Sequence, residues 1–307
     1  MNTNALPAPR ATISLLAVAC LAASGGAGAA TPRYDSLSVE VIGKGRPVLM
    51  IPGLNSGASV WRDTCAALQK DHVQCHLVQL PGFAGAAPVE GADAAFVESM
   101  RDRVLAYAKA RHLKNPVVVG HSLGGMLALE MAIAAPDAVG PLVIVDSLPF
   151  FPAASNPAAT VETARPMAEG MRTQMRASDE ASYAKGVDAS VATMAHDPAR
   201  VDTLKTWGRQ SDRGTTTQAM YELMTTDLRP QLSKVKSPTL VLGSWAAYKP
   251  YGSSKESTAN IFRTQYAGLE GVRIEMSEAG YHFLMWDDPT WVQSNIRDVL
   301  VAHPQAK

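Results

Sequence analysis

The sequence lacks three features that would indicate a partner at once. It has no excess of charge, because 28 Lys and Arg residues balance 28 Asp and Glu residues. That balance argues against nucleic acid as a partner and against electrostatic docking on a membrane. It has no apolar stretch long enough to span a bilayer. It also has no metal cluster, phosphate loop or nucleotide fingerprint, so we expect a small-molecule ligand and neither a cofactor nor a metal.

What remains is the composition of a globular protein. Hydrophobic residues make up 47% of the 307 positions and charged residues 18%, which allows a substantial core. The first thirty residues differ from the rest: Arg10 precedes an apolar run at 11–23, and small residues follow as far as Ala30. This order predicts a secretory signal peptide, residues 1–30, and an exported protein, secreted or periplasmic. Cys20, after three small or apolar residues, leaves a lipid anchor open as an alternative.

Cysteine is scarce, at three residues. Removing the signal peptide leaves Cys65 and Cys75, which lie in adjacent predicted elements. In an oxidising compartment these two can form a disulfide. Two independent buried thiols are the alternative, because free cysteine packs like a small apolar side chain.

Short apolar runs alternate with longer segments of helical spacing over most of the chain. Apolar and β-branched runs predict buried strands, and apolar residues recurring every three or four positions predict helices. The predicted strands are 38–42, 48–51, 73–80, 117–119, 142–145, 239–243 and 272–276, and the helices are 59–70, 93–111, 123–135, 254–266 and 289–302. This alternation predicts an α/β fold, a mainly parallel sheet with helices on both faces.

Residues 149–230 interrupt the alternation. They contain several helical patterns but no strand-like run, and their methionines either pack the segment or face a ligand. The segment lies between two predicted strands, so we expect an inserted helical cap over the carboxyl edge of the sheet, where ligands bind in open α/β sheets. The core is then formed by residues 31–148 and 231–307.

The most informative motif is Gly120-His121-Ser122-Leu123-Gly124, between a β-branched run and an apolar helical segment. A strand that turns this sharply into a helix needs glycines beside the turn, because side chains there would collide with neighbouring backbone. We expect Ser122 at the apex to be strained, with its hydroxyl exposed near a helix N-terminus. Backbone amides at that end favour developing negative charge, so the arrangement suits a nucleophilic serine.

A serine hydroxyl needs an adjacent base to act as a nucleophile. Among the seven histidines, His282 follows the late strand 272–276 in a loop that emerges at the same sheet edge as Ser122. We therefore expect His282 to be the general base. Three nearby residues are interpreted structurally: His121 points away from the serine hydroxyl, His196 ends a cap helix, and Asp288 is the N-cap of the last helix.

These motifs resemble those of the α/β-hydrolase superfamily, and the resemblance rests on the Ser122 turn, on Ile51-Pro52-Gly53, on Leu80-Pro81-Gly82-Phe83 and on Gly280-Tyr281-His282. It spans residues 36–148 and 230–303. The resemblance implies an α/β-hydrolase fold and a serine esterase or lipase-like activity, with nucleophile, acid and histidine in that order. It also implies that the backbone N–H groups of Leu54 and Leu123 form the oxyanion hole.

The acid of the triad is where the sequence departs from the family pattern. Family members carry an Asp shortly after the strand that corresponds to 239–243, and here Ala246 stands at that position. Asp146, at the end of strand 142–145, is the preferred acid, similar to relatives that carry it one strand earlier. A capping role for Asp146, with Glu256 as the next carboxylate to test, is the alternative.

Together these residues predict an exported, carboxylesterase-like serine hydrolase. Ser122, His282 and Asp146 would cleave a small-molecule carboxylic ester through a covalent acyl-enzyme. One alternative is a noncatalytic small-molecule binding member of the fold, which the missing Asp after Gly243 favours. Another is a lactonase or carbon–carbon bond hydrolase that uses the same serine. Residues that either line an apolar site or pack are Phe83, Trp245, Tyr248 and Tyr251.

Overall fold

The computed structural model describes residues 1–2, 37–91 and 94–305 of the chain. Most of the predicted signal peptide, including Cys20, lies outside the described residues. Within them, no helix is both long and apolar enough to cross a membrane.

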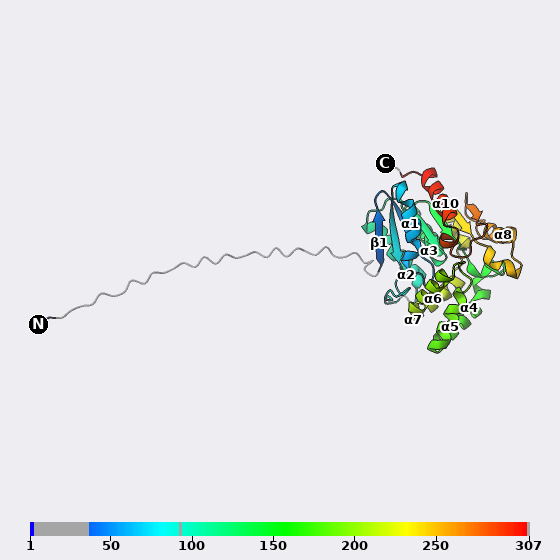
Figure 1. The fold of residues 1–307 in the computed structure, drawn as a ribbon, viewed down its shortest axis with the longest axis horizontal. Coiled ribbons are helices and arrows are strands. Elements are labelled where there is room, and N and C mark those ends of the chain that lie inside the picture. The colour runs from blue at the N-terminus through cyan, green and yellow to red at the C-terminus, as the bar shows by residue number, and fades with distance from the viewer. Residues whose placement is uncertain (3–36, 92–93, 306–307) are drawn as a thin grey trace. The chain divides into compact units, whose positions relative to one another are not determined.

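Seven strands form one sheet in the order β1-β3-β2-β4-β5-β6-β7 (Figure 1). Their bounds are β1 Ser38–Gly43, β2 Arg46–Ile51, β3 Val73–Gln79, β4 Val117–His121, β5 Leu142–Val145, β6 Thr239–Gly243 and β7 Arg273–Met276. Every neighbouring pair is parallel except β1 with β3, which is antiparallel. The predicted α/β class with a mainly parallel sheet is confirmed, and each predicted strand is present within two residues of its expected ends.

Helices cover both faces of the sheet. Those of the core are α1 Arg62–Leu68, α2 Phe96–Ala110, α3 Leu123–Ala134, α8 Lys255–Gln265, α9 Leu284–Asp287 and α10 Pro289–Ala302. Along β2, Val48 and Met50 pack in the cluster that contains α1 and α10, whereas Leu49 and Ile51 pack in the cluster that contains α2 and α3. Successive side chains of a strand point to opposite faces, so a continuously apolar strand supplies both clusters.

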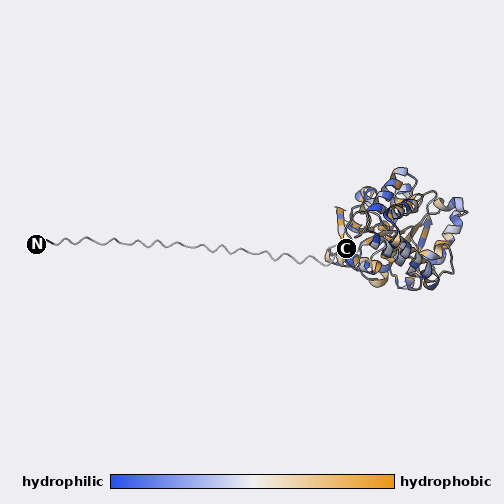
Figure 2. Cartoon of the chain, turned by 90° about the horizontal axis from the view of Figure 1, so that it is seen from below, coloured by the Kyte–Doolittle hydropathy of each residue, from blue (hydrophilic) through white to orange (hydrophobic). Residues whose placement is uncertain are grey.

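Residues 149–230 form helices and no strand, and all of them are described. We define the cap as α4 Val161–Ala177, α5 Glu180–Val191, α6 Pro198–Gln210 and α7 Arg213–Thr225, all inserted between β5 and β6. In Figure 1 these four helices lie together at the lower side of the sheet domain, away from α10. Figure 2 shows hydrophilic and hydrophobic residues mixed along the surface helices.

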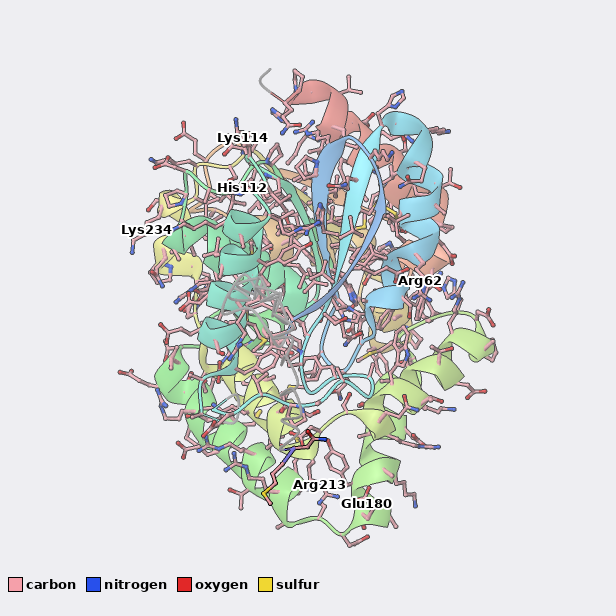
Figure 3. All side chains as sticks on the ribbon, turned by 90° about the vertical axis from the view of Figure 1, so that its left-hand side faces the viewer. Arg62, His112, Lys114, Glu180, Arg213 and Lys234 are labelled. Carbon is pink, nitrogen blue, oxygen red and sulfur yellow. A yellow bond between two sulfur atoms is a disulfide. The ribbon has the colours of Figure 1, made fainter. Side chains whose placement is uncertain are left out.

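A side chain caps the N-terminus of each cap helix. The N-cap residues Thr160, Asp179, Asp197 and Asp212 all accept a backbone N–H from the first turn. Such a cap contributes about 1 kcal/mol to helix stability. Figure 3 shows Arg213 and Glu180 side by side at one end of the cap, where their side chains form an ion pair of 2.8 Å. The cap is therefore an ordered unit with its own local stabilisation.

Polar contacts join the cap to the core. The carboxylate of Glu222, on α7, accepts the backbone N–H groups of Phe96 and Val97 at 2.7 Å each. These are N–H groups of the first turn of α2, which have no partner within their own helix. The negative charge also lies at the positive end of the α2 dipole, so Glu222 stabilises the core helix from the cap.

Cys65 of α1 and Cys75 of β3 form a disulfide, with Cα atoms 6.1 Å apart. Both residues are fully buried in the cluster between the sheet and α10. The bond ties a covering helix to the strand beneath it.

Candidate active site

Strand register brings the candidate residues to one edge of the sheet. His121 pairs with Val145 across β4 and β5, and Val145 pairs with Leu242 across β5 and β6. The loops that follow β4, β5 and β6 therefore begin beside one another at the carboxyl edge of the sheet. Ser122 and Asp146 are the first residues after β4 and β5, so two residues 24 positions apart lie side by side at the carboxyl edge.

The turn at Ser122 has the strained geometry that the motif predicts. Ser122 has φ 52° and ψ −118°, a conformation that side-chain-bearing residues rarely adopt. A Cβ on Gly120 would lie 2.2 Å from the carbonyl oxygen of Gly124, and a Cβ on Gly124 would lie 2.4 Å from that of Ile51. Only glycine fits at either position, because α3 starts directly against the ends of β2 and β4.

Two backbone amides beside the serine have no acceptor in the described part of the chain. Among the described residues, neither Leu54 nor Leu123 donates its N–H to a protein group. A Cβ on Gly53, the residue before Leu54, would lie 3.1 Å from the Cβ of Ser122, so the loop after β2 passes against the serine. Two unused N–H groups near a candidate nucleophile are the arrangement that an oxyanion hole requires.

His282 and Asp146 form a direct pair. Nδ1 of His282 lies 2.6 Å from Oδ2 of Asp146. The carboxylate also accepts the backbone N–H of Ser244 at 2.7 Å and its hydroxyl at 2.8 Å. These contacts fix the carboxylate, so Nδ1 of His282 carries the hydrogen and Nε2 of the neutral ring has a free lone pair.

In this chain the carboxylate that contacts His282 comes from the end of β5, and not from the loop after β6 where family members carry the acid. Ser244 begins the loop after β6 and donates two hydrogen bonds to Asp146. Ala246 stands two residues further on, at the start of a short 3₁₀ helix. Glu256 is on α8 and pairs with Arg263 at 2.5 Å, with 77% of its side chain exposed. Of the carboxylates considered, Asp146 contacts the ring of His282.

The hydroxyl of Ser122 forms no hydrogen bond within the described part of the chain. The ring of His282 lies 4.5 Å, centroid to centroid, from that of His121, the residue before Ser122. Serine–histidine hydrogen bonds are often long or poorly aligned in ligand-free sites and tighten with substrate. The serine, the imidazole and the carboxylate therefore lie at a single sheet edge, with the serine side chain free to turn.

His121 makes a contact that the sequence analysis did not predict. Its side chain is fully buried, and Nε2 donates to the backbone oxygen of His282 at 2.9 Å. Burial lowers the pKa of His121 well below its usual value, and the nearby His282 lowers it further. A neutral ring with its hydrogen on Nε2 follows. His121 thus supports the backbone of the candidate base, and no periodicity or motif marks that contact.

The predicted N-cap position of Asp288 is confirmed, whereas the predicted helix end at His196 is wrong. Asp288 occupies the N-cap position of α10, but its carboxylate accepts the Ser277 hydroxyl at 2.8 Å and caps no helix amide. His196 does not end a helix: it lies between α5 and α6, and its ring packs edge-on against Tyr281 at 3.9 Å. Both residues contact the segment that carries His282: Asp288 accepts the Ser277 hydroxyl, and His196 packs on Tyr281.

The aromatic residues considered for the site have different surroundings. Phe83 is fully buried and packs against Phe96, so it belongs to the core. Tyr248 follows β6 and is 52% exposed, while burial around its hydroxyl and the charge of Asp146 raise the pKa of that group. Tyr251 is 82% exposed.

No group of three His, Cys, Asp or Glu side chains in the described ranges has the geometry to hold a metal ion.

The strained Ser122 and the pair of His282 with Asp146 share the carboxyl edge of a parallel sheet, an arrangement typical of the strand–turn–helix motif in α/β hydrolases. The sequence model of the alpha/beta hydrolase family matches residues 48–293, and the chain belongs to that family.

Some proteins of named function resemble this chain over part of its length. The chain is 36% identical over 123 residues to the pimeloyl-[acyl-carrier protein] methyl ester esterase of Vibrio atlanticus, covering 40% of this chain and 45% of that protein. It is 36% identical over 114 residues to the Vibrio cholerae protein of the same name, covering 37% and 42%. The alignments span less than half the length of these relatives.

Solved structures share the fold over most of the chain. The enol-lactonase of Burkholderia xenovorans LB400 superposes with a TM-score of 0.69 at 16% identity, covering 86% of this chain and 96% of that one. An esterase from Exiguobacterium antarcticum superposes with a TM-score of 0.68 at 18% identity, covering 86% and 95%. At these identities the likeness concerns the fold.

Proposed function

We propose that this protein is a serine hydrolase that cleaves a carboxylic ester through a covalent acyl-enzyme, with Ser122, His282 and Asp146 as its triad. The observation that carries the proposal is the 2.6 Å contact between His282 and Asp146 at the sheet edge where the strained Ser122 lies. Membership of the alpha/beta hydrolase family and relatives named as methyl ester esterases support the same reaction class.

The first half-reaction forms the acyl-enzyme. Asp146 holds the Nδ1–H of His282, so Nε2 accepts the proton from Ser122 as Oγ attacks the ester carbonyl carbon. The carbonyl oxygen becomes an oxyanion that accepts hydrogen bonds from the N–H groups of Leu54 and Leu123. The intermediate then breaks its carbon–oxygen bond, and the imidazolium gives its proton to the departing alcohol.

The second half-reaction releases the acid. His282 takes a proton from water, whose oxygen attacks the acyl carbon of Ser122 and forms a second oxyanion in the same hole. Collapse of this intermediate frees the carboxylic acid and returns the proton to the Ser122 oxygen. Asp146 stays a carboxylate throughout, since its role is to fix the tautomer and stabilise the imidazolium.

A serine-directed probe tests this proposal. Wild-type protein is expected to bind a fluorophosphonate covalently at Ser122 and to release a burst of p-nitrophenol from a p-nitrophenyl ester. Ser122→Ala removes the nucleophile, so labelling should be lost and turnover should fall by at least about 10⁴-fold. Peptide mass spectrometry locates the label, and circular dichroism checks that the variant is folded.

The alternatives give different results in the same assays. A noncatalytic binding protein would neither take the label nor release a burst. A lactonase or a carbon–carbon bond hydrolase would take the label at Ser122 but turn over a lactone or a diketone in preference to linear esters. A panel of esters of increasing acyl length, run beside one lactone and one diketone, therefore separates these activities.

We also propose that the protein is exported after removal of a signal peptide at residues 1–30. The apolar run 11–23 and the pairing of Cys65 with Cys75, a bond typical of oxidising compartments, support this. Cell fractionation and the intact mass of the mature chain test it. A cytosolic protein that retains residues 1–30 would contradict export.

A further inference from the structure

The loop that carries His282 is held through a buried carboxylate. We call residues 277–288, between β7 and α10 and including the short helix α9, the His282 loop. Asp287, near its end, has a side chain only 2% exposed. Its carboxylate accepts the backbone N–H of Tyr281 at 3.0 Å, within the same loop. It also accepts the backbone N–H of His196, with contacts of 3.1 and 3.2 Å to its two oxygens.

His196 belongs to the cap, so this carboxylate joins two separate parts of the molecule. We call residues 194–197, between α5 and α6, the cap bridge. The cap bridge makes a second contact, in which Phe283 donates its backbone N–H to the Met194 carbonyl oxygen at 3.1 Å. The ring of His196 also packs on the ring of Tyr281. The residues on either side of His282 are therefore both held from the cap bridge.

His282 itself is held from the sheet. Its carbonyl oxygen accepts from His121 at 2.9 Å, and its ring donates to Asp146 at 2.6 Å. The orientation of the imidazole is the combined result of sheet contacts at residue 282 and cap contacts at residues 281 and 283. A displacement of the cap bridge would consequently move the backbone on both sides of the imidazole.

We propose that Asp287 is a positioning residue that couples the cap to His282. The inference rests on the proposed function, because it concerns the alignment of the base. Asp287 does not contact the ring of His282 among the hydrogen bonds of the described residues, so it acts through the backbone. A carboxylate suits this role, since it accepts donors on both oxygens, whereas an amide has one accepting oxygen and would present its NH₂ to a donor.

The test is Asp287→Asn, compared with Asp287→Glu and a matched control, Asp63→Asn. Asp63 also joins the core to the cap, through an exposed ion pair of 3.0 Å with Arg200. We expect D287N to lower kcat for a p-nitrophenyl ester by about 10- to 100-fold with little change in KM, because small misplacements of catalytic groups cost this much. D287E, which keeps both oxygens, should recover part of the loss, and D63N should keep wild-type kcat.

Proton NMR separates positioning from a general structural effect. The hydrogen shared by Nδ1 of His282 and Asp146 should give a downfield resonance in the wild type, and D287N should shift or broaden it. Folded D287N with wild-type kcat and an unchanged resonance would overturn the proposal. So would a loss of kcat that D63N reproduces with the resonance intact.

Hydrogen exchange on the wild type keeps the proposal testable if D287N fails to fold. Fluorophosphonate labelling of Ser122 should change the protection of the cap bridge and the His282 loop together, because coupling is reciprocal. A change confined to the His282 loop would refute the coupling. Wild-type protein that resists both probe and ester would instead refute the proposed function, and the resonance in D287N would still decide the coupling.

Discussion

The sheet and the cap position the candidate site by different means. Strands β2, β4, β5 and β6 are almost entirely buried and place Ser122 and Asp146 by backbone register. Cap helices α4 and α5 are mostly exposed, and the cap meets the core through the apolar side chains of Val201, Leu204 and Ala219 as well as through polar contacts, such as those of Glu222 and of the cap bridge. The serine and the acid are therefore fixed by the most deeply buried part of the fold, whereas the histidine loop depends on both parts.

The loop after β2, which carries the proposed oxyanion donor Leu54 and which we call the oxyanion loop, is also contacted by the cap. Asn55, directly after Leu54, has a left-handed backbone with φ 58°. Its side-chain oxygen accepts the hydroxyl of Thr216, on cap helix α7, at 2.6 Å. Residues with positive φ are held by their surroundings. The cap thus contacts both loops that face the nucleophile, and substitutions in sheet and cap should have effects of different size.

The largest effect is expected in the sheet, at the candidate acid. Asp146→Asn should lower kcat/KM for a reactive ester by about 10⁴-fold, because an amide cannot hold the Nδ1–H tautomer of His282. Steady-state kinetics measure this, with thermal unfolding to show that the fold is retained. Ser244→Ala is the control: it removes one of the donors to Asp146 and should cost about tenfold or less. Near wild-type turnover in D146N would reduce Asp146 to a structural residue.

The second effect is a loss of folding stability at acid pH, caused by a buried histidine of the sheet. His76, in β3, is fully buried, with Nδ1 2.7 Å from the Tyr107 hydroxyl. Burial, assisted by the charge of Arg111, lowers its pKa to about 4. An unfolded histidine titrates near about 6.5, so the unfolded state binds the proton first. This contribution to stability is complete above pH 6.5 and is lost as the pH falls toward 4, to a total of about 3 kcal/mol.

His76→Gln removes the titrating group and tests that sign. The variant should be less stable than wild type at pH 7, yet lose less unfolding free energy between pH 7 and pH 4.5, as measured by urea unfolding. The buried His121 also has a lowered pKa and should account for part of the remaining slope. Parallel pH curves for H76Q and wild type would show that His76 contributes nothing.

The smallest effect is expected in the cap. Thr216→Val removes the hydroxyl that holds Asn55 and should lower kcat several-fold at unchanged KM, since a neutral hydrogen bond contributes about 1 kcal/mol. Thr217→Val is a matched control on the same helix, because the buried hydroxyl of Thr217 has no partner among the described residues. Equal kcat values for T216V and T217V would mean that the cap does not support the oxyanion loop.

Much of the fold could be predicted because its signals are local. The apolar run at 142–145 is a buried strand, and the glycines beside Ser122 have carbonyl oxygens where a Cβ would stand. The contact between His282 and Asp146 joins residues 136 positions apart, so the sequence left a choice of carboxylates that strand order resolves geometrically. The helix end predicted at His196 was wrong, and the carboxylate of Asp288, although this residue is the N-cap of α10, accepts the Ser277 hydroxyl, because a residue beside a helix start can direct its side chain to another segment.

Local sequence patterns were enough to predict the strands, most helices, the sharp turn at Ser122 and the inserted cap, because periodicity and backbone sterics act over a few residues. The bond from His121 to the backbone of His282 and the contact of Asp287 with the cap bridge emerge from the packing of the folded chain. Those contacts depend on where separate elements meet, and a buried polar group takes whichever partner the packed fold brings within hydrogen-bond distance.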